Sequence, residues 1–153
     1  MNDSTRLFHV ETDADLDRAF PVIVQLRPHL TPESFRTRVR QQMTQGYRLA
    51  ALEAGGRIRS LAGYRLNDFL WCGRVMYVDD LVTDEASRSH RHGETIFNWL
   101  RDLAQAGGCG ELHLDSGVQR ARAHRFYFRQ GMQVEDFHFV TKVEPLHAPA
   151  AAE

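Results

Sequence analysis

A basic run at residues 88–93, Arg-Ser-His-Arg-His-Gly, stands between a predicted strand and a predicted helix. Residues 76–83 are rich in β-branched and aromatic side chains, as strands are. The helix is indicated by apolar residues that share one helical face: Ile96, Leu100, Leu103 and Ala104. The first N–H groups of a helix have no partner within the helix, and the helix dipole is positive there. Arginine and glycine beside such a helix start suit an anion such as a phosphate.

This run resembles the pyrophosphate loop, Arg/Gln-x-x-Gly-x-Gly/Ala, of the GCN5-related N-acetyltransferases (the GNAT family). Arg91 stands where the family usually has its first glycine, and it either adds a charge to the phosphate or blocks the close approach that glycine permits. A second stretch, Ala123-x-x-Phe126-Tyr127-x-x-x-Gly131-Met132, resembles the family's Ala-x-x-Phe-Tyr-x-x-x-Gly-Phe. The resemblance extends to about residue 143.

The resemblance implies an α/β fold (α+β mixed) of the GNAT type. Its central, mixed, mostly antiparallel twisted sheet would have six to seven strands, with about four helices on both faces. Residues 1–143 would form a single acetyltransferase domain, and residues 144–153 a flexible C-terminal tail. The implied enzyme transfers acetyl from acetyl-CoA to a primary amine by direct attack in a ternary complex. The alternative is a catalytically weak, GNAT-like regulatory module that binds acyl-CoA.

Acetyl transfer from a thioester requires that the pyrophosphate be held and that the pantetheine arm be aligned. By resemblance, the backbone at the end of the fourth strand would pair with pantetheine, and the helix after residue 120 would also meet coenzyme A. The predicted cofactor-binding residues are Leu81, Val82, Thr83, Arg88, Ser89, His90, Arg91, His92, Gly93, Glu94, Arg120 and Ala123. Arg120 stands where the family often has asparagine.

Two side chains are predicted to handle protons. Tyr127 matches the position at which many family members place the acid that protonates the leaving thiolate. The amine arrives as an ammonium, so a carboxylate is expected near it. Asp79 and Asp80 are neighbours in a strand, which predicts that their side chains point to opposite faces. Similarity to the polyamine-acetylating branch favours Asp79 as the base or substrate contact, with Asp80 or a water as the alternative.

The lip of the acceptor site is predicted in the loop between the first two helices, at residues 26–30. The predicted substrate-binding residues are Arg27, His29, Asp79 and Asp80. The partner is a small-molecule or peptide amine, and the sequence leaves its identity open because acceptor choice depends on loops.

Hydrophobic periodicity and turn residues predict the elements that position these side chains. Strands are expected at residues 7–10, 47–53, 58–66, 76–83, 111–115 and 132–143. Helices are expected from Thr12 or Asp13, with a kink or restart at Pro21, and then from Pro32 to about residue 45, from the basic run to Gly107, and over 120–130. The hairpin before the fourth strand turns near 67–68 or 72–73.

Composition narrows the function classes. A chain of 153 residues suits one domain, and a net charge of −1 gives no general case for nucleic-acid or membrane binding. Cys72 and Cys109 form no disulfide framework, and the chain shows no secretory segment and no apolar run of about 20 residues. These features predict a soluble, cytoplasmic protein. A homodimer is plausible in the resembled fold, but nothing in the sequence fixes it.

Other readings have weaker support. A metal site built on His90, His92, His113 and His124 lacks a cysteine or carboxylate that completes a recognisable set, so no metal is predicted. Nucleotide-hydrolase, dinucleotide-binding and hydrolase-elbow motifs are absent from the sequence. An acyl-cysteine route through Cys109 is disfavoured because this residue follows the glycine turn after the helix. The basic helix at 120–129 leaves a nucleic-acid binder as an alternative.

Overall fold

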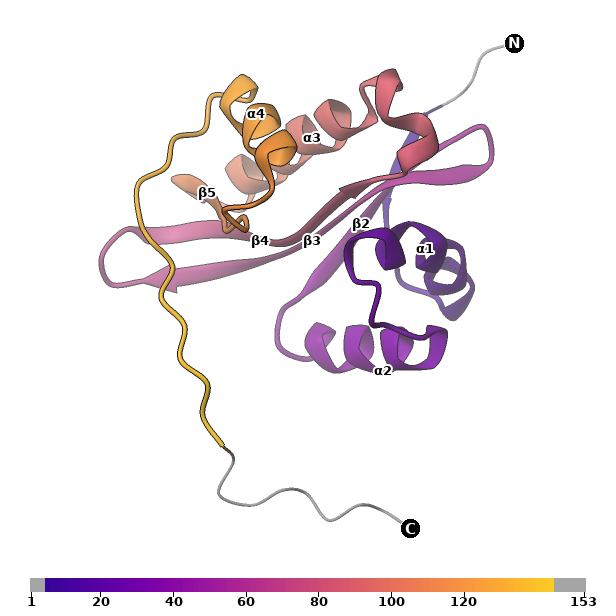
Figure 1. Cartoon of the computed structure of the whole chain (residues 1–153), viewed down its shortest axis with the longest axis horizontal. Coiled ribbons are helices and arrows are strands. Elements are labelled where there is room, and N and C mark those ends of the chain that lie inside the picture. Colours follow the sequence, from indigo (N-terminus) through magenta and orange to yellow (C-terminus); the bar gives the residue numbers. More distant parts are fainter. Residues whose placement is uncertain (1–4, 145–153) are drawn as a thin grey trace. The chain divides into compact units, whose positions relative to one another are not determined.

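The computed structural model describes residues 5–144, which divide between Asp115 and Ser116 into two compact units (Figure 1). Residues 145–153 of the predicted tail lie outside the described part. No helix among the described residues has both the length and the apolar character that crossing a lipid bilayer requires.

The first unit contains a five-stranded sheet in the order β1-β2-β3-β4-β5. The strands are β1 (Arg6–His9), β2 (Arg48–Ala54), β3 (Arg57–Phe69), β4 (Gly73–Thr83) and β5 (Glu111–Leu114). Strands β1 to β4 pair antiparallel with their neighbours, whereas β5 pairs parallel with β4. The parallel pairing requires a crossover, and helix α3 (His92–Ala106) supplies it.

Two helices precede β2, and capping residues determine where each begins. Thr12 caps α1 (Asp13–Leu26) and Thr31 caps α2 (Pro32–Met43), each through a reciprocal pair of hydrogen bonds with the third helical residue. Pro32 occupies the first helical position, where its missing N–H has no consequence. Pro21 lies inside α1 without ending it, so the predicted restart of this helix does not occur.

Along each strand, successive side chains point alternately into two hydrophobic cores, one on each face of the sheet. On β2, Leu49 and Ala51 join α1 and α2, while Ala50 and Leu52 join α3. The helices α1 and α2 therefore cover one face and α3 the other, as Figure 1 shows. The prediction of helices on both faces is confirmed.

The second unit contains helix α4 (Ala121–Arg129), within the predicted range of 120–130. Gly131, with φ of 82°, follows its end, and the Met132 N–H returns to the Tyr127 carbonyl at 3.1 Å.

The predicted strand at residues 132–143 is wrong, because residues 132–144 form neither helix nor strand. The described sheet therefore has five strands instead of six or seven. A strand forms only where another strand offers backbone partners, and the described residues of this second unit contain none. The apolar side chains Val134, Phe137, Phe139 and Val140 are correspondingly exposed.

Candidate active site

The basic run of residues 88–93 covers the end of the connection from β4 to α3 and the first two residues of α3. A 3₁₀ segment, η1 (Glu85–His90), follows β4, and Arg91 then leads into the helix. Arg91 has φ of 61° and is the one non-glycine residue with a positive φ in the described range. It thus adopts the left-handed conformation that glycine adopts with little strain, which explains why glycine suits this position in the resembled loop.

The Arg91 side chain is directed along the helix. Its guanidinium forms a two-pronged contact with Glu94, Nε to Oε2 at 2.7 Å and NH2 to Oε1 at 3.1 Å, and the side chain is 78% exposed. This contact raises the pKa of Arg91. The Arg91 side chain, at the N-cap position, makes no capping hydrogen bond to the start of α3. The helix start therefore keeps the dipole and the exposed backbone geometry that suit an anion, with an arginine beside it.

The other basic residues of the run make local contacts. Arg88 pairs with Glu85 at 3.6 Å, and the His90 Nδ1 lies 3.3 Å from the Ser87 carbonyl oxygen. The imidazoles of His90 and His92 stack with their centroids 5.6 Å apart. The run is thus a compact basic surface at the start of α3.

Asp84 anchors the beginning of this connection to α1 and β3. Gln25 of α1 donates to the Asp84 carboxylate at 3.0 Å and accepts from the Glu85 N–H at 3.0 Å. Arg59 of β3 contacts the same carboxylate at 3.4 Å. These contacts, the Gln25 hydrogen bond first, hold the pKa of Asp84 below its usual value.

The last residues of β4 are paired on one side. Leu81, Val82 and Thr83 pair with β3, and the Thr83 hydroxyl lies 2.8 Å from that of Ser60. On the other side β5 pairs only with Val75 to Val78, and it ends at Leu114. Within residues 5–115, the β5-facing backbone of β4 is therefore without strand pairing from Asp79 to Thr83.

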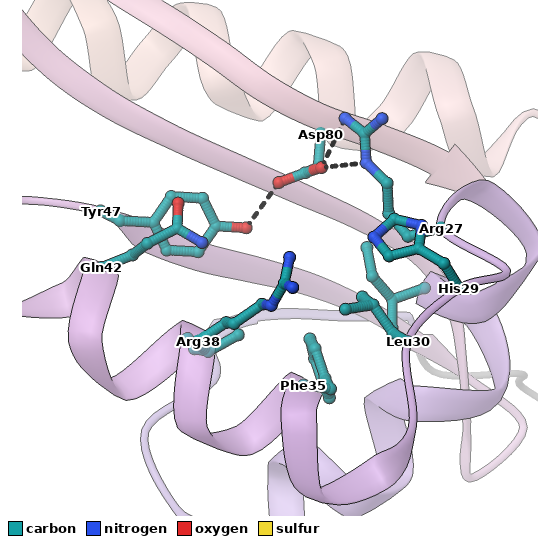
Figure 2. A pocket seen from close by; sticks show the side chains of 10 residues that line it. Arg27, His29, Leu30, Phe35, Arg38, Gln42, Tyr47 and Asp80 are labelled. Carbon is teal, nitrogen blue, oxygen red and sulfur yellow. Dashed lines mark hydrogen bonds and ion pairs between the residues drawn. The ribbon is translucent and has the colours of Figure 1, made fainter. Parts of the chain in front are cut away.

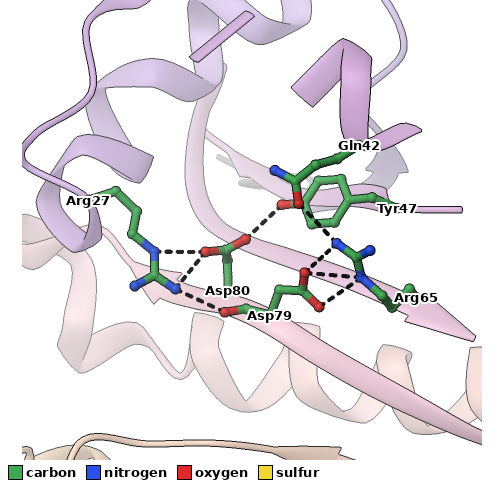
Figure 3. Close-up of polar contacts among 6 residues, drawn as sticks. All are labelled: Arg27, Gln42, Tyr47, Arg65, Asp79 and Asp80. Carbon is green, nitrogen blue, oxygen red and sulfur yellow. Dashed lines mark hydrogen bonds and ion pairs between the residues drawn. The ribbon is translucent and has the colours of Figure 1, made fainter. Parts of the chain in front are cut away.

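A β-bulge changes the direction of the two neighbouring aspartates. Gly63 of β3 pairs with Asp80 while Tyr64 pairs with Val78, so Asp79 is an extra residue in β4. A bulge disturbs strict alternation and redirects the side chains on the bulged strand. Both carboxylates join one polar network, drawn in Figure 3. The prediction that Asp79 and Asp80 point to opposite faces is therefore wrong.

Asp80 is held by a tyrosine and an arginine. The buried Tyr47 hydroxyl donates to Asp80 Oδ2 at 2.9 Å, and Arg27 Nε donates to Asp80 Oδ1 at 2.9 Å (Figure 3). Burial first, and then the Asp80 carboxylate, raise the pKa of Tyr47 well above its usual value, so this phenol stays protonated. Gly63 permits the contact, because a Cβ there would lie 1.9 Å from the Tyr47 hydroxyl oxygen.

Asp79 has a different partner. Arg65 of β3 contacts it through Nε at 3.1 and 3.2 Å and through NH2 at 2.6 Å. The same NH2 donates to Gln42 of α2 at 2.9 Å, and the guanidinium lies 5.5 Å from the centre of the Tyr47 ring. The hydrogen bond to Asp79 raises the pKa of Arg65. Asp79 is thus engaged in a bidentate ion pair.

A pocket of about 280 Å³ opens between the α1–α2 loop, α2 and β4 (Figure 2). Among the predicted substrate-binding residues, Arg27, His29 and Asp80 line it, whereas Asp79 does not. Its lining also includes Ile23, Leu30, Phe35, Arg38, Val39, Gln42 and Tyr47. Arg38 points into the pocket in Figure 2 and makes no ion pair with a described residue. The pocket therefore combines one carboxylate with two guanidinium groups.

The second unit carries the remaining predicted residues. Arg120 precedes α4 as its N-terminal cap, Ala123 lies in its first turn, and Tyr127 lies near its end. His124 contacts the Gly117 carbonyl oxygen at 2.9 Å, which ties the helix to the preceding turn. The proposed acid role of Tyr127 stays a prediction.

Several residues of the network were missed in the sequence. Tyr47, Gln42 and Arg65 belong to the network and Arg38 to the pocket lining, and no motif links any of them to the aspartates of β4. The one available signal was Gly63, since an isolated glycine inside a strand pattern often marks a bulge or a close backbone approach. The Tyr77 hydroxyl, which donates to Asp115, was also missed.

Comparison with known proteins agrees with this arrangement. The sequence model of the acetyltransferase (GNAT) family matches residues 12–132. An uncharacterized N-acetyltransferase, YhdJ, of Bacillus subtilis is 32% identical over 123 residues, covering 79% of this chain and 87% of that protein. The aminoalkylphosphonate N-acetyltransferase of Salmonella typhimurium is 27% identical over 139 residues, covering 87% of this chain and 88% of that protein.

A solved structure, the aminoglycoside N-acetyltransferase AAC(6')-Iy in complex with CoA, has a similar fold. Its TM-score is 0.77 at 12% identity, and the match covers 93% of this chain and 98% of that one. The family match spans the β4–α3 connection, the pocket and α4. The chain belongs to the GNAT family of acetyltransferases.

Proposed function

We propose that the chain is an N-acetyltransferase that moves acetyl from acetyl-CoA to the primary amine of a small, acidic molecule. The amine nitrogen attacks the thioester carbonyl directly in a ternary complex, so a C–N bond forms and the C–S bond breaks. The observation that carries this proposal is the course of β4. This strand runs from the pocket carboxylate of Asp80 straight into the basic connection before α3.

The cofactor side uses backbone groups and cations. The start of α3 binds the pyrophosphate, with Arg88 and Arg91 as nearby charges. The backbone of Leu81, Val82 and Thr83, which β5 does not reach, pairs with the pantetheine arm, and a free N–H there polarises the thioester carbonyl. The AAC(6')-Iy complex with CoA supports the choice of cofactor, because that protein has the same fold.

Asp80 is the carboxylate that meets the amine. It lines the pocket, whereas Asp79 lies outside the lining and is paired with Arg65. Asp80 holds the ammonium and takes its proton directly or through a water, and Tyr47 and Arg27 fix the carboxylate for this task. The leaving thiolate takes a proton from Tyr127. Asp79 holds Arg65 in position through its ion pair and does not serve as the base.

The charge of the pocket indicates the kind of amine. Arg27 and Arg38 outnumber Asp80 in the lining, and a simple cationic amine would meet net repulsion there. An amine that also carries a phosphonate, phosphate or carboxylate would pair its acid with Arg38 and its ammonium with Asp80. The volume of about 280 Å³ suits a small molecule. The Salmonella relative is named for an acceptor of this class, an aminoalkylphosphonate.

A thiol-release assay with acetyl-CoA tests the proposal. The panel compares acidic amines with an amine of equal length that lacks the acid: 2-aminoethylphosphonate and β-alanine against propylamine, with a short peptide as a further acceptor. We expect release of one thiol per acetylated amine, with the highest kcat/KM for an acidic amine.

Arg38→Gln gives a sharper test of the acceptor class. It should lower kcat/KM for the acidic amine by roughly 10- to 100-fold, mainly through KM, because one charge-assisted contact is lost. The turnover of propylamine should not fall and should rise slightly, because the substitution also removes a charge that repels its ammonium group. Arg36→Gln is the matched control, since Arg36 lies in the same helix but pairs with Asp17 at 3.3 Å outside the pocket lining.

The outcomes separate the parts of the proposal. Turnover without preference for acidic amines would contradict the proposed acceptor class and support the acetyltransferase activity. Tight acetyl-CoA binding, measured by calorimetry, with no turnover of any amine would favour the alternative of an acyl-CoA-binding regulatory module. Absence of acetyl-CoA binding would contradict both the enzyme and the regulatory module.

A further inference from the structure

A second polar cluster lies at the other end of β4, away from the basic connection. It joins the turn of the β3–β4 hairpin to the edge strand β5. Cys72 is the last residue of that turn, and Glu111 and His113 belong to β5. The parallel register pairs Val75 with Glu111, which brings the start of β5 beside the hairpin turn.

The two β5 residues share one face of their strand. Side chains alternate along a strand, so Glu111 and His113 point to one side and Leu112 and Leu114 to the other. Leu112 and Leu114 pack against the core beneath α3. Glu111 and His113 are thereby directed to the opposite face, where they meet the cysteine.

The distances place three different donor atoms together. The Cys72 Sγ, an imidazole nitrogen of His113 and a carboxylate oxygen of Glu111 all lie within 4.8 Å of one another. His113 Nε2 is 2.6 Å from Glu111 Oε2. The Trp71 ring packs against the His113 imidazole, with centroids 5.5 Å apart, and covers one side of the cluster.

A thiolate, an imidazole and a carboxylate are the ligands that zinc takes in proteins. Magnesium and calcium prefer oxygen ligands alone, so this set selects against them. The ligand atoms around one tetrahedral zinc are about 3.3–3.8 Å apart, given metal–ligand distances near 2.0–2.3 Å. The contact between His113 and Glu111 must lengthen by about 0.7 Å, which the half-exposed Glu111 side chain can achieve by changing its rotamer.

We propose that Cys72, Glu111 and His113 form a binding site for Zn²⁺ or a similar borderline divalent cation, with water in the fourth position. The sequence predicted no metal because no cysteine or carboxylate completes a recognisable ligand set with His90, His92, His113 and His124. In the structure Glu111 and His113 lie on the same strand, and the parallel pairing of β5 with β4 brings Cys72 of the hairpin turn beside them. A bound ion would connect the hairpin turn to the edge strand, in addition to the pairing of β5 with Val75 to Val78 of β4.

The experiment uses the full chain without a histidine tag, titrated with Zn²⁺ by calorimetry and followed by thermal unfolding. We expect one Zn²⁺ per chain and a rise in the unfolding temperature of about 5–10 °C at a hundredfold excess over the dissociation constant. Cys72→Ser and His113→Ala should each weaken binding at least about tenfold. Cys109→Ser, which changes the other thiol, should bind as the parent does.

Cobalt provides an independent readout, because a thiolate ligand gives Co²⁺ a charge-transfer absorption band. The band should form in the parent and in Cys109→Ser and be missing in Cys72→Ser. Circular dichroism of the metal-free variants shows whether each has folded. Equal zinc affinity in parent, Cys72→Ser and His113→Ala would overturn the proposal and place any bound zinc elsewhere, for instance at His90 and His92. A dissociation constant above about 1 mM would overturn it too.

Discussion

Gly63→Ala should destabilise the protein through one buried contact. The added Cβ would lie 1.9, 2.5 and 2.7 Å from the hydroxyl oxygen, Cζ and Cε2 of Tyr47. Tyr47 is only 3% exposed, so its ring must shift within a packed core. Overpacking of this kind costs about 1–3 kcal/mol, and losing the Tyr47 hydrogen bond to the Asp80 carboxylate adds about 1.5–3 kcal/mol. We expect the free energy of unfolding to fall by about 2.5–6 kcal/mol.

Urea denaturation followed by tryptophan fluorescence measures this loss. The sharper measurement is a double-mutant cycle with Tyr47→Leu, which removes the end of the ring that the methyl would strike. In that background Gly63→Ala should cost less than about 1 kcal/mol. Gly110→Ala is the matched control, because a Cβ at Gly110 meets nothing within 4 Å. An equal effect of Gly63→Ala with and without the tyrosine ring would refute the reasoning.

Three further predictions concern the cofactor and the connection that holds it. Tyr127→Phe should slow thiol release by roughly 10- to 1000-fold while acetyl-CoA affinity by calorimetry stays the same, and unchanged turnover would remove this phenol from the mechanism. Gly93→Asp should abolish acetyl-CoA binding by steric block and charge repulsion at the start of α3, and retained affinity in a folded variant would show that the pyrophosphate lies elsewhere. The stabilisation from ionised Asp84 should be fully present above the ordinary aspartate pKa of about 3.9 and be lost as the pH falls through the lower pKa of the folded protein. The stability difference between the parent and Asp84→Asn, measured from pH 7 to pH 3, should therefore shrink only at the acidic end, and a difference that shrinks near neutral pH would contradict this origin.

The sequence was sufficient for the elements with strong local signals. The capping residues Thr12 and Thr31 mark the starts of α1 and α2, and the apolar face of Ile96 and Leu100 marks α3. The run at 88–93 was placed correctly after β4 and at the start of α3, because strand, turn and helix signals follow one another there. In each case the information lies within a few neighbouring residues.

The bulge at Asp79 could not be predicted in the same way. It depends on how β3 and β4 pair, which is fixed by side chains far from it in the sequence, among them Tyr47 against Gly63. Strict alternation therefore gave the wrong faces for Asp79 and Asp80. The segment at 132–143 failed for a related reason, since its β-type composition specifies a strand only when a partner strand is present.

Gln25 gives the two ends of the proposed active site a thermodynamic connection. This residue belongs to α1 and forms hydrogen bonds with the Asp84 carboxylate and the Glu85 N–H. Two residues later in the chain, Arg27 donates a hydrogen bond to Asp80 in the pocket. Any shift of the basic connection on cofactor binding thus acts on the end of α1. By linkage, whatever factor acetyl-CoA imposes on acceptor affinity, the acceptor imposes equally on acetyl-CoA. The size of this coupling would then depend on one glutamine side chain.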